Sequence, residues 1–157
     1  MESPYRWRKV SALTTSAKVA PEHEALRNGI DRTWDKVDNG VWIEPTGTAA
    51  AVYEWERPVR LSGARVVFDS DFKVRGKRMR KLEATQERVE MPKMLAKGFR
   101  IEVRTGGEWR TVFSDGANYR RLRKVTFDPV DATALRLVVT ASWGGGKAHV
   151  FAFDALK

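Results

Sequence analysis

The chain has 157 residues, of which 42% are hydrophobic and 31% charged, a composition that excludes a disordered chain and allows a hydrophobic core of ordinary size. It has no cysteine, which excludes disulfides and cysteine-based zinc sites, and it has no apolar run of membrane-spanning length. A formal net charge of +9 favours encounter with polyanions without choosing among them. The first nine residues lack the apolar stretch of a signal peptide, so we expect a soluble chain of unknown compartment.

The predicted elements are mostly strands. One short helical turn is expected at 21–27, because Pro21 suits the first helical position and Glu22 and Glu24 complement the positive end of the helix dipole. Alternating apolar and polar residues, rich in β-branched and aromatic types, then predict strands at 51–55, 59–68, 99–104, 109–113, 124–127, 135–140 and 149–153. Turn residues separate these segments, among them Arg57-Pro58 and Asp128-Pro129. The pattern favours an all-β fold, an antiparallel β-sandwich or jelly roll of about eight strands.

Two segments have a more specific interpretation. Gly106 and Gly107 lie between two alternating segments and predict a β-hairpin, because glycine supplies the positive φ that tight hairpin turns require. The segment 73–97 is dense in charge, poor in β-branched residues and interrupted by Gly76 and Pro92. We expect residues 1–157 to form a single domain with a long loop or insertion at about 73–97, and loops of that length are usually functional or poorly ordered.

The sequence lacks the usual catalytic motifs. The chain has two histidines, no HExxH, no GxSxG, no Walker loop and no GxGxxG that opens a helix. A carboxylate pair assembled from distant residues is the catalytic alternative that spacing leaves open. We therefore expect a binding module and not an enzyme.

The N-terminal part carries a resemblance. A threonine- and serine-rich segment, interpreted as a strand, is followed by 25–34 (ALRNGIDRTW), 41–44 (VWIE) and a strand that ends at 58–63 (PVRLSG). This order resembles the discoidin family, also called the coagulation-factor type C or galactose-binding-like family. The segments 91–93, 99–103, 118–121 and 150–154 are similar to the C-terminal domain of certain bacterial flavin-dependent oxidoreductases. The resemblance implies an eight-stranded jelly roll, ligand loops at one end, sugar binding and, often, a structural calcium ion.

Calcium is the one cofactor that the resemblance implies. Its candidate ligands are Asn28, Asp31 and Thr33. Asn28 replaces the aspartate usual in the family, and His149 stands where a late glutamate often closes the site, so calcium should bind less well. The alternative for this segment is a turn held by Asx-type hydrogen bonds.

Sugar sites combine an aromatic platform with polar hydrogen-bonding groups, and this chain offers such a set near its predicted loops. Trp143 precedes three glycines that leave its face open, and Asn118, Tyr119 and Arg121 follow an Asp-Gly turn. The alternatives are that Trp143 folds back over the core and that 118–121 is only the start of a surface strand. The remaining tryptophans on strands, including Trp42, are interpreted as core or sheet-face residues.

The basic run at 73–81 contains three further candidate binding residues, Arg75, Lys77 and Arg78, which would bind an anion. The alternative is that the run is only a solvated surface, as such runs usually are. We therefore expect a non-catalytic carbohydrate-binding module whose partner is a glycan, with acidic glycans favoured by the basic charge. The alternative is an accessory domain that docks onto a larger catalytic protein, a flavin-dependent oxidoreductase, through an exposed apolar patch at Met79, Met91, Met94 and Leu95. Electrostatic nucleic-acid binding is the third and least favoured interpretation.

Overall fold

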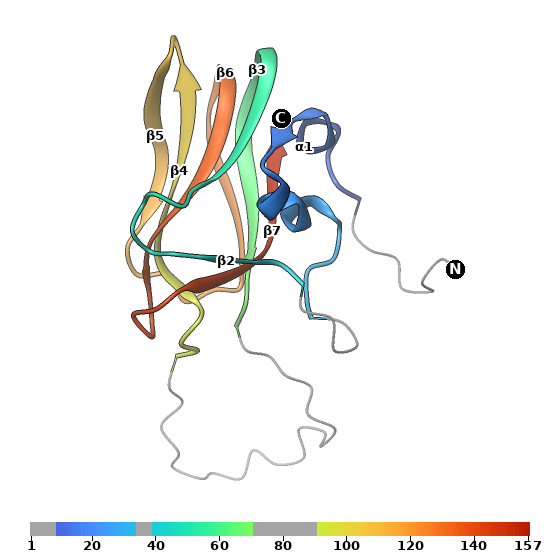
Figure 1. Cartoon of the computed structure of the whole chain (residues 1–157). Coiled ribbons are helices and arrows are strands. Elements are labelled where there is room, and N and C mark those ends of the chain that lie inside the picture. The colour runs from blue at the N-terminus through green and yellow to red at the C-terminus, as the bar shows by residue number, and fades with distance from the viewer. Residues whose placement is uncertain (1–8, 34–38, 71–90) are drawn as a thin grey trace, which may run out of the picture.

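The computed structural model describes residues 9–33, 39–70 and 91–157, and this part of the chain is built almost entirely from strands (Figure 1). Its elements in chain order are the helix α1 (Ala12–Ser16), β1 (Lys18–Val19), the 3-10 helix η1 (Pro21–Arg27), β2 (Val41–Ile43), β3 (Ala51–Phe68), β4 (Ala96–Thr105), β5 (Glu108–Asp115), β6 (Leu122–Ser142) and β7 (Ala148–Leu156). The seven described strands confirm the predicted all-β sandwich class.

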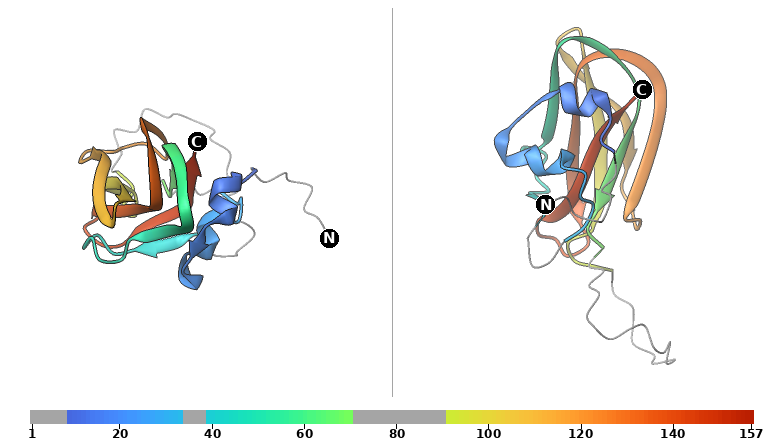
Figure 2. Two further views of the ribbon diagram at one scale, coloured as in Figure 1. Left: turned by 90° about the horizontal axis from the view of Figure 1, so that it is seen from above. Right: turned by 90° about the vertical axis from the view of Figure 1, so that its right-hand side faces the viewer.

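The strands are hydrogen-bonded in the order β2-β7-β3-β6-β4-β5, with β1 added to β3, and every pair is antiparallel. The long strands β3 and β6 pair with each other in three stretches, at 51–54 with 134–137, at 59–61 with 130–132 and at 63–67 with 122–126. Both strands arch over the upper end of the molecule (Figure 2). One layer therefore contains β2, β7 and the second half of β3, and the other contains β4, β5 and the second half of β6.

The two predicted proline turns are wrong, because neither ends a strand. Pro58 lies inside β3 and Pro129 inside β6, and the pairing of these strands shifts register between Glu54 and Val59 and again between Leu61 and Gly63. Proline has no backbone N–H to donate, but at an irregularity the hydrogen-bond ladder is already interrupted. The chain bends and continues, and four predicted strands become two.

The predicted hairpin and the helical turn are confirmed. The β4–β5 connection has Gly106 at φ 59° and Gly107 at φ 83°, the positive angles that a two-residue hairpin turn requires. The helical turn is the 3-10 helix Pro21–Arg27. The long loop expected at 73–97 is too long by two residues, because β4 begins at Ala96; residues 73–90 of it lie outside the described part.

The threonine- and serine-rich segment predicted as a strand is instead the helix α1. Ser11 caps the helix, with its Oγ accepting a hydrogen bond from the backbone N–H of Thr14 at 3.2 Å. The same hydroxyl donates to the carbonyl of Ala155 at 2.6 Å, and the Thr14 hydroxyl accepts from the Ala155 N–H at 2.9 Å. These hydroxyls favour a capped turn over a strand, because they satisfy backbone groups of β7 as well as of the helix itself.

The core lies between the layers and is rich in aromatic side chains. The ring of Tyr53 stacks on Phe153 with 5.1 Å between centroids, and its hydroxyl donates to the Phe153 carbonyl at 2.6 Å. Phe68 meets Phe99 edge to face, also at 5.1 Å. Both contacts join elements far apart in the sequence, and each buried aromatic side chain contributes on the order of 2 kcal/mol through area burial alone. No helix among the described residues is long and apolar enough to cross a membrane.

Candidate functional site

Several connecting segments meet at the lower end of the molecule in Figure 1, opposite the β4–β5 turn; we call this region the loop end, comprising 69–70, 91–95, 116–121 and 143–147. Backbone hydrogen bonds tie these segments together. The N–H of Asn118 donates to Lys97 at 2.8 Å, that of Trp143 to Leu95 at 3.1 Å and that of His149 to Met94 at 3.0 Å. The structure thus brings Trp143 and the 118–121 segment to the same end.

Asn118 holds this end together from inside. Its side chain is fully buried and donates to the carbonyls of Ala96 at 2.9 Å and Arg120 at 3.1 Å. Its Oδ1 accepts from the Arg120 N–H at 3.2 Å and from Arg123 Nη1 at 2.9 Å. Both amide N–H groups and the carbonyl oxygen are therefore occupied within the protein, so Asn118 positions the loop and does not face a ligand.

Trp143, the expected sugar platform, is partly buried and packs against the core. Its indole N–H donates to the Asn118 carbonyl at 2.8 Å, and the Lys97 ammonium lies 4.9 Å from its ring centroid. The side chain is thus fixed at its polar edge and has a cation at its ring. It therefore matches the alternative of folding back over the core more closely than that of an open platform.

The next two expected residues differ in exposure. Tyr119 is 64% exposed, and the Arg120 guanidinium lies 5.4 Å from its ring centroid. Arg121 instead turns inward, donates to the backbone carbonyl of Asp31 and lies 5.3 Å from the ring of Phe151. Burial lowers the pKa of Arg121 despite the opposing charges of two nearby aspartates. Tyr119 is accessible to a ligand, whereas Arg121 mainly connects β6 to the segment before β2.

The expected calcium residues form a hydrogen-bonded turn. Asn28 Oδ1 accepts from the Ile30 N–H at 2.9 Å, and its Nδ2 donates to Asn39 Oδ1 at 2.7 Å. Asp31 is paired with Arg65 Nη2 at 3.0 Å, and Thr33 is exposed. Within the described ranges no group of three or more acidic, histidine or cysteine side chains converges. An arginine-paired carboxylate and an occupied amide do not fit calcium, which needs several anionic oxygens.

The remaining expectations concern the long loop. Arg75, Lys77, Arg78 and Met79 lie outside the described residues. Of the apolar patch predicted for docking, Leu95 is buried and Met91 packs against the core. In the described part these two side chains contribute to the core instead of an exposed docking patch.

Trp42 is an exposed aromatic side chain that we did not predict as a binding residue. It lies on the edge strand β2 between buried Val41 and Ile43 and is 46% exposed. Its ring stacks on His149 with 4.3 Å between centroids and 12° between planes. His149 is buried, and its Nδ1 lies 2.7 Å from Asp69 Oδ2. A buried, hydrogen-bonded imidazole therefore supports one face of an accessible indole.

A pair of charged groups lies beside Trp42. Because Trp42 pairs with His149 and Ile43 with Ala148, Glu44 and Lys147 follow as the next cross-strand neighbours on the same face. The Lys147 ammonium lies 3.6 Å from Glu44 Oε1, and both side chains are half exposed. We call Trp42, His149, Glu44 and Lys147 the Trp42 platform. It combines a flat apolar surface with polar groups that can bond to hydroxyls.

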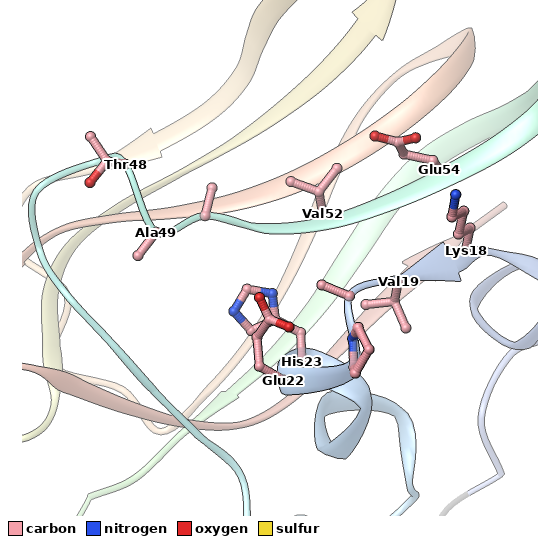
Figure 3. Close-up of a pocket in the computed structure, with 11 residues that line it drawn as sticks. Lys18, Val19, Glu22, His23, Thr48, Ala49, Val52 and Glu54 are labelled. Atoms are coloured by element: carbon pink, nitrogen blue, oxygen red, sulfur yellow. The ribbon is translucent and has the colours of Figure 1, made fainter.

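A groove lies apart from the loop end. It has a volume of about 590 Å³ between residues 18–23 and residues 48–54, and none of the expected site residues lines it (Figure 3). Lys18, Glu22, His23 and Glu54 supply its charged and titratable groups. Burial lowers the pKa of His23, and the neighbouring Glu22 carboxylate opposes this effect without cancelling it.

No protein-family model and no curated protein matches the chain. Solved structures do match. A chitosan-binding module of a Paenibacillus sp. IK-5 chitosanase/glucanase, solved with chitotriose, is 13% identical with a TM-score of 0.62, over 92% of this chain and 99% of its own. The family 32 carbohydrate-binding module of Streptococcus pneumoniae EndoD is 18% identical with a TM-score of 0.56, over 94% of this chain and 99% of its own. The family 32 module of C. perfringens NanJ, solved with galactose, is 12% identical with a TM-score of 0.55, over 90% of this chain and 93% of its own.

These similarities show the fold of the chain. The three neighbours named above are carbohydrate-binding modules, two of them of family 32, which has the discoidin-like fold that the sequence resembles. The comparisons do not show the similarity to flavin-dependent oxidoreductases. Because fold does not determine function, the function must be argued from the site itself.

Proposed function

We propose that the protein is a non-catalytic carbohydrate-binding module and that its glycan stacks on Trp42 at the platform defined above. The observation that carries the proposal is the exposed indole of Trp42, held in place by the buried ring of His149. A pyranose presents an apolar C–H face that packs on such a ring, and a supported ring loses little conformational entropy on binding. The fold shared with carbohydrate-binding modules supports the same conclusion.

The charged pair next to the ring gives the platform its polar component. Glu44 accepts and Lys147 donates hydrogen bonds, so together they can bond to adjacent hydroxyls of one sugar. Their ion pair is half exposed, and exposed pairs contribute at most about 1 kcal/mol, so a ligand can open it at low cost. The excess of basic residues favours an acidic glycan through steering of its approach.

The deciding experiment is binding of the purified chain to an array of neutral, uronic and sulfated glycans at about 0.15 M salt, with duplex DNA as a polyanion control. Trp42→Ala and Trp143→Ala are assayed beside Leu122→Ala, which removes another exposed apolar side chain. We expect Trp42→Ala to weaken glycan binding by at least about tenfold and Leu122→Ala to leave it unchanged.

Each other outcome contradicts a defined part of the proposal. Loss of binding in Trp143→Ala, together with wild-type binding in Trp42→Ala, would place the site at Trp143 and Tyr119. Equal retention of every polyanion, with no effect of either tryptophan variant, would show that the net charge alone causes binding.

A further inference from the structure

A second cluster with binding character lies on the layer that contains β4, β5 and β6. Cross-strand pairing places Glu102 opposite Arg136 and Arg104 opposite Trp109. Cross-strand partners and residues two positions apart on a strand share one face of a sheet. Arg100, Arg104, Arg136 and Trp109 therefore lie with Glu102 on one face, which we call the arginine face.

Glu102 orients two of these arginines. Its carboxylate is buried and accepts from Arg100 Nε at 2.7 Å, from Arg136 Nε and from the Thr111 hydroxyl at 3.2 Å. Burial raises the pKa of Glu102, but the hydrogen bonds and charges of Arg100 and Arg136 outweigh that effect and hold the pKa below its ordinary value. The carboxylate is therefore ionised, and it fixes the two guanidinium groups through their Nε atoms.

Trp109 forms a wall beside the guanidinium groups. Arg136 lies 4.0 Å and Arg104 5.5 Å from its ring centroid. Stacking on an aromatic ring holds a guanidinium in a fixed plane and leaves its edge able to meet an anion. An arginine has five N–H donors. Within the described residues, Arg136 donates a hydrogen bond from its Nε to the Glu102 carboxylate.

The charges on this face are unbalanced. Three guanidinium groups share the buried carboxylate of Glu102 and one exposed carboxylate, that of Glu54, which lies 3.8 Å from Arg104 Nη1. Diagonal neighbours on adjacent strands lie about 7–8 Å apart, so the like charges repel one another. An anion between them would relieve this repulsion and would form charge-assisted hydrogen bonds, which are about twice as strong as neutral ones.

The arginine face continues into the groove of about 590 Å³. Val52 is the cross-strand partner of Arg136, and Glu54 contacts Arg104; both residues also line the groove (Figure 3). Figure 3 shows Lys18 beside Glu54 at the same wall. The arginine face and the groove therefore form one continuous surface, which suits a chain-like ligand better than an isolated ion.

We propose that the arginine face binds the carboxylate or sulfate groups of an acidic polysaccharide, as a second surface separate from the Trp42 platform. This inference deepens the proposed function, on which it rests, by assigning the acidic part of the ligand to Arg104 and Arg136. Bidentate guanidinium contacts account for the choice of these oxyanions, because the paired N–H donors of arginine match two oxygens of one anion better than the lysine ammonium does.

The test uses the full chain with polygalacturonate, chondroitin sulfate and neutral dextran as probes, in affinity electrophoresis at about 0.15 M salt. Arg104→Gln leaves the bonds to Glu102 intact, and Arg136→Lys keeps the charge but loses the planar fork. Arg60→Gln is the matched control, since it removes an exposed, ion-paired arginine elsewhere. Thermal unfolding of each variant verifies that it is folded.

We expect Arg104→Gln and Arg136→Lys each to weaken binding of at least one acidic polymer about fivefold or more, with Arg60→Gln changing it less than about twofold. A response of polygalacturonate shows that carboxylates are sufficient, whereas a response of chondroitin sulfate alone, which carries both carboxylates and sulfates, assigns the contact to sulfate. Trp42→Ala should abolish stacking of neutral sugars. When Arg104→Gln is added to Trp42→Ala, it should still weaken binding of the acidic polymer, so the two proposals can fail separately. Equal effects of Arg104→Gln and Arg60→Gln, or the same losses with duplex DNA, would overturn the inference.

Discussion

The indole of Trp42 and the imidazole of His149 lie nearly parallel, 4.3 Å apart, on neighbouring strands at one edge of the sheet. Asp69 holds the imidazole from one side, and Gly40 approaches it from another: a Cβ atom at Gly40 would lie 3.1 Å from His149 Nε2. The orientation of the exposed ring therefore depends on residues beneath it that a ligand never touches.

Gly40→Ala should destabilise the protein and weaken the Trp42 platform. Gly40 has φ 90°, and an added Cβ would lie 2.5 Å from the Val150 carbonyl oxygen, so both the backbone and β7 must shift. We expect a loss of about 2 kcal/mol or more in urea denaturation. Gly106→Ala is the control, because φ is also positive there but no atom lies within 4 Å; its loss should be about 1 kcal/mol. Equal losses would contradict the close approach at Gly40.

Asp69→Ala should reduce both stability and glycan binding. The substitution removes the carboxylate 2.7 Å from the buried His149 imidazole, and loss of a hydrogen bond at a buried polar group costs about 1–3 kcal/mol. Because His149 supports Trp42, the fluorescence spectrum of the indole should shift as well. Asp131→Ala removes an exposed carboxylate paired with Arg60 and should change none of these readouts. A folded Asp69→Ala protein with wild-type glycan affinity would show that the support is dispensable.

Local sequence patterns predicted the features of the fold that depend on residues adjacent in the chain. The period of two found β3 to β7, although it divided β3 and β6 in two, and Gly106-Gly107 found the hairpin, because these signals depend on neighbouring residues. The same alternation, with Val41 and Ile43 buried, was a usable signal that Trp42 points outward. The pairing of β2 with β7 could not be predicted, since it joins segments about a hundred residues apart and depends on the complete sheet.

The prolines illustrate the other limit of sequence reasoning. Pro58 and Pro129 carry ordinary turn signals, and only the shifted register between β3 and β6 makes them compatible with continuous strands. Likewise, Trp143 and Asn118 were predicted as members of one sugar site, but the indole N–H bond to the Asn118 carbonyl, which fixes Trp143, is a tertiary contact. Sequence spacing indicates which residue types gather at the loop end but not which of them remain exposed.

Asn118→Ala should be among the most destabilising substitutions at the loop end. It removes two donated and two accepted hydrogen bonds of a fully buried amide and leaves the carbonyl of Ala96 without this donor. We expect a loss of about 2–4 kcal/mol, measured by chemical denaturation. Its neighbour Tyr119 is 64% exposed, so Tyr119→Ala should change the free energy of unfolding by less than about 0.5 kcal/mol. The reverse order would contradict the assignment of Asn118 as the anchor.

Glu102→Gln should change how stability depends on pH. The arginines lower the pKa of Glu102 in the folded protein, so the folded state favours the ionised form more than the unfolded state does. This contribution is complete above the pKa of the unfolded glutamate and is lost as the pH falls through the lower pKa of the folded state. Wild type should therefore exceed Glu102→Gln in stability near neutral pH, and the difference should shrink on acidification.

Urea denaturation of both proteins between about pH 7 and pH 3 measures this difference directly. Asp131→Asn serves as the control, because its carboxylate is exposed and its ion pair with Arg60 is 3.3 Å long, so its curve should run parallel to that of wild type. The glutamine amide can still accept a hydrogen bond from Arg136 but carries no charge to balance it. A pH-independent difference between wild type and Glu102→Gln would therefore mean that packing and hydrogen bonding, and not charge, are what Glu102 supplies to the arginine face.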